Sequence, residues 1–266
     1  MQQLIEKFDP SRYLPYLSTT RIAAEAPESV AILPVGSIEQ HGPHLPVGTD
    51  LLFGQVFLWE ALALVPAEYK MLALPSVAYG RSNEHDSYPG TLSSTGMHLY
   101  ETLMDIGDSV QRSGFRKLLL WNSHGGNRPV VEMCGRDIRA RTGLKTFIVN
   151  AGLAGGAYPL SPAEEDAGLH AGDVETSIML AAFPDLVDLS VAPSEQPRFT
   201  FPPKGEIGFQ LESSRGPAVM SWITEDLTAS GILGDPKTAT AENGRKAIDK
   251  AAAVLARLFM QAAELE

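Results

Sequence analysis

The stretch Leu33-Pro-Val-Gly-Ser-Ile-Glu-Gln-His-Gly-Pro-His-Leu-Pro-Val-Gly-Thr-Asp50 decides both the fold prediction and the first functional prediction for this chain. It overlaps Val30 to Val35, a continuous apolar run of strand length, and leads into a helical pattern over Leu51 to Leu64. Pro34 predicts that the strand stops there, because proline cannot donate to a central ladder. Two carboxylates and two imidazoles then fall within twelve residues. Stable packing alone does not require such a density of potential metal ligands.

Strand and helix signals continue to alternate along the chain. In order, we expect a helix near Thr19 to Ala26, a strand over Met71 to Leu74, a helix capped by Thr95 and ending at Gly114, a strand over Lys117 to Asn122, a helix from about Pro129 to Arg141, a strand over Lys145 to Asn150, a helix from His170 to about Phe183 and a helix from about Thr238. This alternation predicts an α/β protein with a mostly parallel sheet covered by helices on both faces.

The remaining segments are predicted to be irregular. Residues 76–93 form a long loop, and loops of that length inside compact domains are usually functional or disordered. Residues 151–169 are expected to form a second loop, and residues 184–235 show no period that assigns them. No linker marks a second domain, so we expect one domain over residues 1–266.

The composition excludes several classes of function. Lys and Arg number 21 against 32 Asp and Glu, and the resulting net charge of -11 would repel nucleic acid and anionic membranes. No apolar run approaches the roughly 20 residues that span a bilayer, and the N-terminus has no signal core. The single cysteine, Cys134, falls at helical spacing with apolar residues and is expected to be a buried structural thiol. We predict a cytoplasmic protein that binds neither nucleic acid nor membrane.

Two strands end directly in glycine-rich loops that contain histidine. Glu39-Gln-His41 follows the first strand, and Ser123-His124-Gly-Gly follows the strand that ends at Asn122. Open parallel sheets bind ligands outside the carboxyl ends of their strands, so both loops are expected at the same edge. Glu39 and His41, two residues apart, would project to one side of an extended segment. Asp50 could return to the same point, where its two oxygens would allow it to bridge two cations.

This mixed set of nitrogen and oxygen ligands suits Zn, Mn or Fe rather than Ca, which takes oxygen ligands only. The helix signature His-Glu-x-x-His, the elbow Gly-x-Ser-x-Gly and the phosphate loop are all absent. Ser123 could act as a nucleophile beside His124, but nothing in the sequence identifies its partners. The spacing alone indicates a metal-dependent hydrolase.

Other polar residues have less specific interpretations. His98 is expected on a helix surface, and His44 is expected to have a supporting or structural role. Glu175 lies in the first turn of a predicted helix, where a carboxylate also complements the macrodipole, so by itself it would be interpreted as a cap.

The motifs described so far resemble those of the creatininase (creatinine amidohydrolase) family. The resemblance rests on four motifs over about residues 30–180, which are the opening stretch, Tyr79-Gly-Arg-Ser-Asn-Glu84-His85 followed by Pro89-Gly-Thr, Asn122-Ser-His124-Gly-Gly-Asn127, and His170-Ala-Gly-Asp-Val-Glu175-Thr-Ser. It implies a three-layer α/β/α sandwich, a centre with two divalent transition-metal ions and a homo-oligomer, typically a hexamer.

The resemblance also implies roles for individual residues. Metal ligands would be Glu39, His41, Asp50 as the bridge, His124 and, completing the shell, Glu175. His170 resembles the family's catalytic histidine, and Ser82 and Gly125 would contact the substrate. Two cations about 3.5 to 4 Å apart would hold a hydroxide and polarise an amide carbonyl. His170 would then carry a proton to the departing nitrogen.

The sequence also departs from creatininase itself. There the metal-binding histidine is followed by a tyrosine and a glutamate, whereas Gly125 and Gly126 follow His124 here. An aromatic and acidic pair is expected upstream of the catalytic histidine, whereas Asp166 and Ala167 stand here.

The function expected first is therefore creatininase-like hydrolysis of a non-peptide or cyclic amide in a small molecule. The alternatives are a formamide deformylase or small-peptide peptidase of the same family, a catalytically silent metal- or ligand-binding module, and an anion site at a helix terminus without metal.

Overall fold

Four parallel strands form the central sheet of the computed structural model, which describes residues 5–193, 195, 197–199, 208–211 and 218–265. The strands are β1 Val30–Val35, β2 Met71–Ala73, β3 Lys117–Asn122 and β4 Lys145–Asn150, in the spatial order β2-β1-β3-β4. All three pairings are parallel, and each strand begins where its sequence signal begins. The prediction of an α/β protein with a parallel sheet is confirmed.

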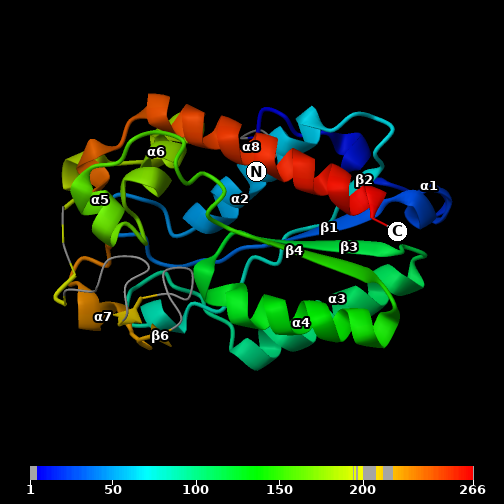
Figure 1. Ribbon diagram of the computed structural model, residues 1–266, viewed down its shortest axis with the longest axis horizontal. Helices are drawn as coiled ribbons and strands as arrows, with labels where there is room; N and C mark the ends of the chain where they lie inside the picture. Colours follow the sequence, from blue (N-terminus) through cyan, green and yellow to red (C-terminus); the bar gives the residue numbers. More distant parts are fainter. Residues whose placement is uncertain (1–4, 194, 196, 200–207, 212–217, 266) are drawn as a thin grey trace.

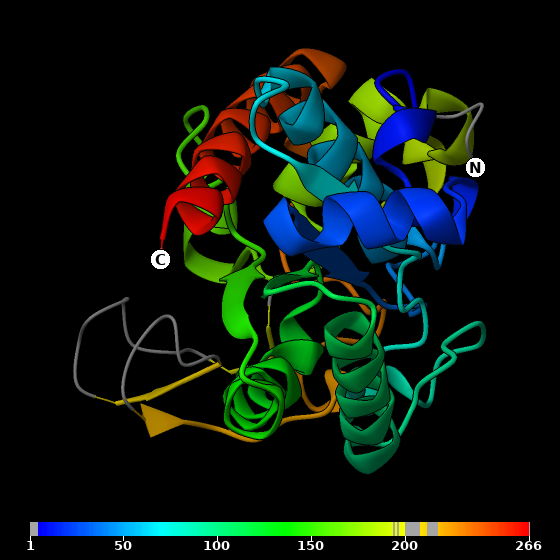
Figure 2. The ribbon, with the colours of Figure 1, turned by 90° about the vertical axis from the view of Figure 1, so that its right-hand side faces the viewer.

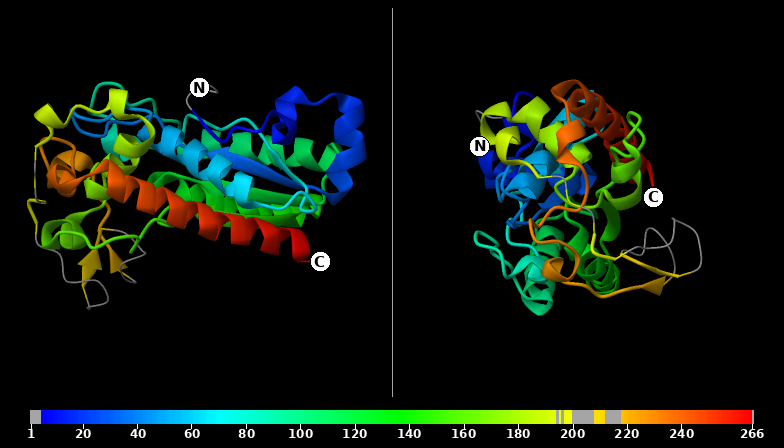
Figure 3. Two further views of the ribbon diagram at one scale, coloured as in Figure 1. Left: turned by 90° about the horizontal axis from the view of Figure 1, so that it is seen from above. Right: turned by 90° about the vertical axis from the view of Figure 1, so that its left-hand side faces the viewer.

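Helices cover both faces of this sheet and complete three layers (Figures 1 and 2). One face carries α2 Thr49–Leu64 and α8 Ala241–Glu264, and α6 Asp173–Ala182 packs beside them. The other face carries α3 Gly96–Arg112 and α4 Arg128–Thr142. Seen from above, α8 runs along the length of the sheet, and α6 lies at one end of the molecule (Figure 3). The three-layer prediction is confirmed.

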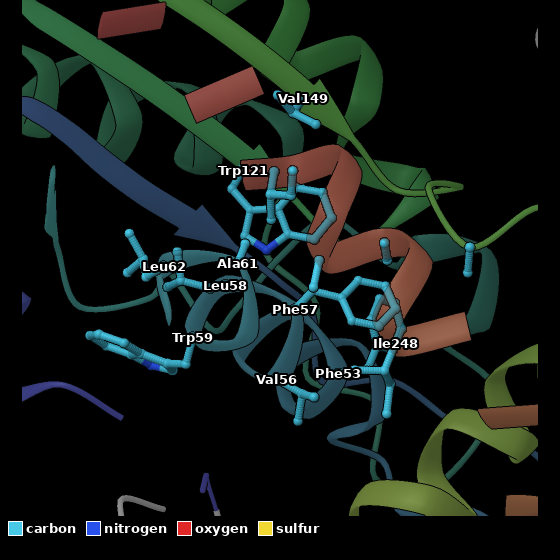
Figure 4. Packing of buried hydrophobic residues seen from close by; sticks show 14 of the residues in the cluster. Phe53, Val56, Phe57, Leu58, Trp59, Ala61, Leu62, Trp121, Val149 and Ile248 are labelled. Carbon is cyan, nitrogen blue, oxygen red and sulfur yellow. The ribbon is translucent and has the colours of Figure 1, made fainter. Parts of the chain in front are cut away.

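Strand side chains alternate between two separate apolar cores. In β1, Val30 and Ile32 pack with the residues of α2 and α8, while Ala31 and Leu33 pack with those of α3 and α4. Trp121 of β3 is fully buried on the first face among the aromatic and aliphatic side chains of α2 and α8 (Figure 4). Fully burying an apolar side chain of this size contributes about 1.5 to 3 kcal/mol, so both faces hold the sheet in place.

The strand β1 continues one residue beyond Pro34, where the sequence predicted that it would stop. The carbonyl of Pro34 accepts a hydrogen bond from Val77 N at 2.9 Å, on the side of β1 that faces away from β3. A residue's N–H and C=O point to the same side of a strand, so the donor that proline lacks also lies on that side. Strand β2 has already ended there, at Ala73. The missing donor therefore removes no bond from the β1–β3 ladder.

The predicted loop over residues 151–169 contains a short helix, α5 Pro162–Ala167, so that prediction was wrong in part. The hydroxyl of Ser161 accepts a hydrogen bond from Glu164 N, and Pro162 occupies the first helical position. Both are helix-start signals that the sequence carries. Few apolar residues follow them, and the helical period is therefore too short to recognise.

The remaining described elements are small. They are α1 Thr19–Glu25, α7 Thr224–Leu227, β5 Phe209–Gln210 and β6 Ala218–Val219. The unassigned segment 184–235 contains the last three of these and also residues that lie outside the described part of the chain. Among the helices that the structure describes, none is long and apolar enough to cross a membrane. Cys134 is buried and His98 exposed, as predicted. The single domain over residues 1–266 stays a prediction.

The packing of α8 on α6 predicts a strong effect of Gly244→Ala. A Cβ at Gly244 would lie 1.8 Å from the carbonyl oxygen of Ser177, which is backbone and cannot move aside alone. The gain in helix propensity is about 1 kcal/mol, but overpacking typically costs about 1 to 3 kcal/mol. We expect a net loss of stability, measured as a lower urea midpoint. Gly96→Ala, whose Cβ would meet only ordinary contacts at 3.4 Å or more, is the control. Equal midpoints for the two variants would contradict the prediction.

Candidate metal centre

Six ionisable side chains from four segments meet at the carboxyl edge of the sheet. They are Glu39 and His41 in the loop after β1, Asp50 in the first turn of α2, His124 directly after β3, and His170 and Glu175 before and within the first turn of α6. All are buried except Glu175, whose side chain is 23% exposed. The structure thus brings together all the residues predicted as metal ligands and the predicted catalytic histidine. Segments more than a hundred residues apart supply them.

Asp50 lies between two groups of ligands. Its Oδ2 is 3.0 Å from Nδ1 of His124, and its Oδ1 is 3.6 Å from Nε2 of His41. Glu39 joins Asp50 and His124 in one group whose ligand atoms lie within 4.8 Å of one another, and Glu175 joins His41 and Asp50 in a second. Each oxygen of one carboxylate therefore faces a different group. This is the arrangement that a bridging ligand between two cations requires.

Backbone carbonyls fix which nitrogen of each imidazole carries the proton. Nδ1–H of His41 donates to the carbonyl of Glu39 at 3.1 Å, and Nε2–H of His124 donates to that of Arg81 at 3.0 Å. Nε2–H of His170 donates to the carbonyl of Gln40 at 2.7 Å. A carbonyl only accepts, so in the neutral form of each ring the opposite nitrogen keeps a lone pair. In all three rings that nitrogen faces the carboxylates, as a metal ligand or a proton acceptor must.

Two atoms at the middle of the site have no hydrogen-bond partner in the described structure. They are Nε2 of His41 and Oδ2 of Asp50, and both are fully buried. Leaving buried polar atoms unpaired costs free energy. Divalent transition metals bind imidazole nitrogen and carboxylate oxygen together, so these atoms fit the implied cations. Glu39, His41 and His170 form a third group at ligand distance, in which His170 would itself be a ligand.

Neighbouring charges strongly shift the pKa values of the side chains in this site. Burial lowers the pKa of His41, but the carboxylates of Asp50, Glu175 and Glu39 outweigh burial and raise it to about 9. Burial raises the pKa of Glu39, yet His124 holds it at about 2. Burial and the nearby carboxylates of Asp50 and Glu39 raise the pKa of Glu175 to about 7, against the opposing effect of His41. A field that draws protons onto imidazoles in this way also favours a cation in their place.

His170 differs from His41 and His124 in its protonation. Burial, together with the nearby His41 and His85, lowers the pKa of His170 well below its usual range, so the ring is neutral. The following residue, Ala171, has φ of 54°, the only positive φ among the described residues other than glycine. This left-handed turn costs about 1 to 2 kcal/mol. It directs the N–H of Ala171 to Oε2 of Glu175 at 2.6 Å, which fixes that carboxylate against His41.

Several supporting residues escaped the sequence interpretation. Nε2 of Gln40 donates to Nδ1 of His85 at 2.9 Å and to the carbonyl of Gly231 at 3.0 Å. The ring of His85 stacks on that of His170 at 4.3 Å, and its Nε2 lies 3.7 Å from Oε1 of Glu39. Gln40 lies in the opening stretch and His85 in the motif that begins at Tyr79, and these positions were the sequence signal for a role at the site. Gly231 carries no local signal at all.

The other predicted residues occupy distinct places. Ser82 is buried, with its hydroxyl against that of Ser37 and 3.3 Å from Nε2 of His124. Gly125 is exposed, and nothing lies within 4 Å of the place where its Cβ would stand. Their substrate-binding roles stay predictions. His44 is buried behind the site, and its Nε2 contacts Oγ1 of Thr176 on α6 at 2.8 Å. That position agrees with a supporting role.

The fold and this site together define a class, namely α/β hydrolases with a candidate two-cation centre at the carboxyl edge of a parallel sheet. The family model of creatinine amidohydrolase (Creatininase) matches residues 16–259. The chain belongs to the creatininase family, and the prediction of a hydrolase acting on C–N bonds is confirmed.

Three relatives make the similarity concrete. A mycofactocin precursor peptide peptidase from Mycolicibacterium smegmatis is 34% identical over 221 residues, covering 82% of this chain and 78% of that protein. A creatinine amidohydrolase from Pseudomonas putida is 31% identical over 243 residues, covering 84% of this chain and 85% of that protein. A solved mutant creatininase of the Zn-Zn type has a TM-score of 0.72 at 26% identity, covering 95% of this chain and 98% of that chain.

The burial of His44 predicts a pH dependence of stability. Burial, with His41 nearby, lowers its pKa to about 4, whereas an unfolded histidine titrates near 6.5. The unfolded state therefore binds the proton first, and the free energy of unfolding falls as the pH drops from about 6.5 to about 4. Between about pH 7 and pH 5 this group alone accounts for a loss of about 2 kcal/mol.

His44→Gln removes that contribution, so the metal-free variant should lose correspondingly less stability over the same interval, measured by urea unfolding in the presence of a chelator. His98→Gln, which changes an exposed histidine, should keep the wild-type pH dependence. The same loss in His44→Gln as in wild type would refute the explanation.

Proposed function

We propose that this protein is a metal-dependent peptidase that cleaves an amide bond of a small peptide at a dinuclear centre. The observation that carries the metal chemistry is the Asp50 carboxylate, whose two oxygens face His41 and His124 separately. The peptide substrate is supported by the peptidase relative, which is 34% identical, against 31% for the creatinine amidohydrolase. The first expectation, a non-peptide or cyclic amide, is therefore the second candidate.

The proposed ligands divide between two cations. Glu39, Asp50 and His124 would hold one, and His41, Asp50 and Glu175 the other. When bound, two divalent ions polarise an amide carbonyl and make water nucleophilic at neutral pH. Zn, Mn and Fe all suit these nitrogen and oxygen donors.

The protein's own contribution to the reaction is the movement of a proton. His170 is neutral, its Nε2–H is tied to the carbonyl of Gln40, and its Nδ1 faces Oε1 of Glu39 at 3.6 Å. A histidine held in this tautomer can accept a proton at Nδ1 and deliver it to the departing nitrogen of the amide. The ring of His170 is held in place between the rings of His41 and His85, whose centroids lie 4.2 and 4.3 Å away.

We also propose an oligomeric state, a cellular location and substrate contacts for this activity. By family resemblance we expect a homo-oligomer, typically a hexamer, and we expect the protein to work in the cytoplasm on a small-molecule amide. Ser82 and Gly125 are the proposed substrate contacts beside His124.

The substrate proposal predicts a clear order of activities. Protein reconstituted separately with Zn, Mn and Fe should cleave members of a short-peptide library, followed as new free amines by mass spectrometry. Creatinine, other cyclic amides and formamidopyrimidines should be turned over more slowly or not at all. A chelator should abolish cleavage, and the returned metal should restore it. Hydrolysis of creatinine without any peptide cleavage would contradict the peptidase proposal, and full activity of metal-free protein would contradict the dinuclear centre.

His170→Ala tests the proton-transfer role. Loss of a general acid or base typically lowers kcat by about 100- to 10,000-fold, so we expect a loss of that size with both metal ions retained. His98→Ala, an exposed histidine on α3, should leave kcat unchanged. Metal content measured by plasma mass spectrometry separates the two possible roles of His170. Loss of one metal ion from His170→Ala would make it a ligand, and unchanged kcat would remove it from the mechanism.

A further inference from the structure

Glu84 is a carboxylate beside the centre that has no part in the proposed mechanism. It lies in a short 3-10 helix, Asn83–His85, within the long loop between β2 and α3. Its side chain is only 15% exposed, and its Oε1 lies 3.8 Å from Nε2 of His124. Oγ1 of Thr224 donates to the backbone carbonyl of Glu84 at 2.7 Å, so the backbone at this position is held from the far end of the chain.

Gly126 is the residue that allows this approach. A Cβ at Gly126 would lie 2.3 Å from Oε1 of Glu84 and 2.5 Å from Nε2 of His124. It would also lie 2.5 Å from the backbone carbonyl oxygen of Arg81, so no residue with a side chain fits here unless the backbone moves as well. The carboxylate of Glu84 thus fills, from a different loop, space into which a side chain at position 126 would otherwise grow.

The charge balance of the centre gives a physical reason for a fourth carboxylate at this position. With both cations bound, Glu39, Asp50 and Glu175 would together carry three negative charges, and His41, His124 and His170 would be neutral in the tautomers fixed by the backbone. As long as no hydroxide is bound between them, two divalent cations would leave one positive charge uncompensated in a buried site. A buried charge without a partner is costly, so a fourth carboxylate at the edge of the centre stabilises the occupied state.

We propose that Glu84 is a further carboxylate of the metal centre, and that it stabilises the cation held by Glu39, Asp50 and His124. This inference depends on the dinuclear centre of the proposed function. Glu84 acts on that cation through its charge and through its position beside His124, 3.8 Å from Nε2. Its effect should therefore be confined to one of the two cations, since the group of His41 and Glu175 lies on the other side of Asp50.

The test measures metal binding rather than activity. Full-length protein is freed of metal with a chelator and titrated with Mn²⁺ by calorimetry. The wild type should bind two ions. In Glu84→Gln, which removes the charge but keeps the shape, one ion should bind about 10- to 100-fold more weakly, the size of effect typical of residues that support metal ligands. Glu101→Gln, which removes an exposed carboxylate on α3, should bind both ions as the wild type does.

The outcomes separate this inference from the proposed function. Two ions in the wild type with unchanged affinities in Glu84→Gln would overturn the role of Glu84 and leave the dinuclear centre standing. Fewer than two ions in the wild type would overturn both. If Glu84→Gln does not fold, the comparison moves to Glu84→Asp and Glu84→Asn, which have the same size and differ in charge. The Asp variant should then bind the affected ion at least about 10-fold more tightly than the Asn variant, and equal affinities would overturn the inference.

Discussion

The position of one carboxylate, Asp50, constrains the rest of this molecule. Three acidic side chains and three imidazoles are brought together in a buried site, and burying charge is unfavourable unless each charge finds a partner. Asp50 meets this demand from the first turn of α2, because one oxygen faces His41 and the other faces His124. That geometry requires β1, β3 and α2 to keep their mutual positions, and the two apolar cores on either face of the sheet provide the necessary rigidity.

Much of the fold and most of the centre could be predicted from local sequence. The strands are uninterrupted apolar runs, and the ligands stand at their carboxyl ends, so the topology of a parallel sheet is enough to place Glu39 and His124 together. Motif resemblance was needed for Glu175, whose sequence context alone favoured a helix cap. The exact end of β1 could not be predicted, because the cost of Pro34 depends on which neighbouring strand its missing donor would face.

The hydrogen bonds that Gln40 makes around His170 and His85 could not be predicted, for a different reason. Gln40 uses its backbone carbonyl to orient His170, and its side chain to join His85 and the carbonyl of Gly231. These contacts link segments separated by up to 191 residues, and no periodic pattern in the sequence predicts a partner at that distance. Residues 184–235 looked irregular for the same reason. Within that segment, Thr224 contacts the loop that precedes α3, and Gly231 contacts the loop that follows β1, so these contacts exist only in the folded chain.

The two glycines after His124 have opposite surroundings. At Gly126 a side chain is excluded by the close approach of Glu84 and His124, so this glycine serves the centre itself. At Gly125 nothing lies within 4 Å of the position of a Cβ, and the residue is exposed. Gly126 therefore accounts for a carboxylate that arrives from another loop, and Gly125 leaves the surface beside His124 free of a side chain.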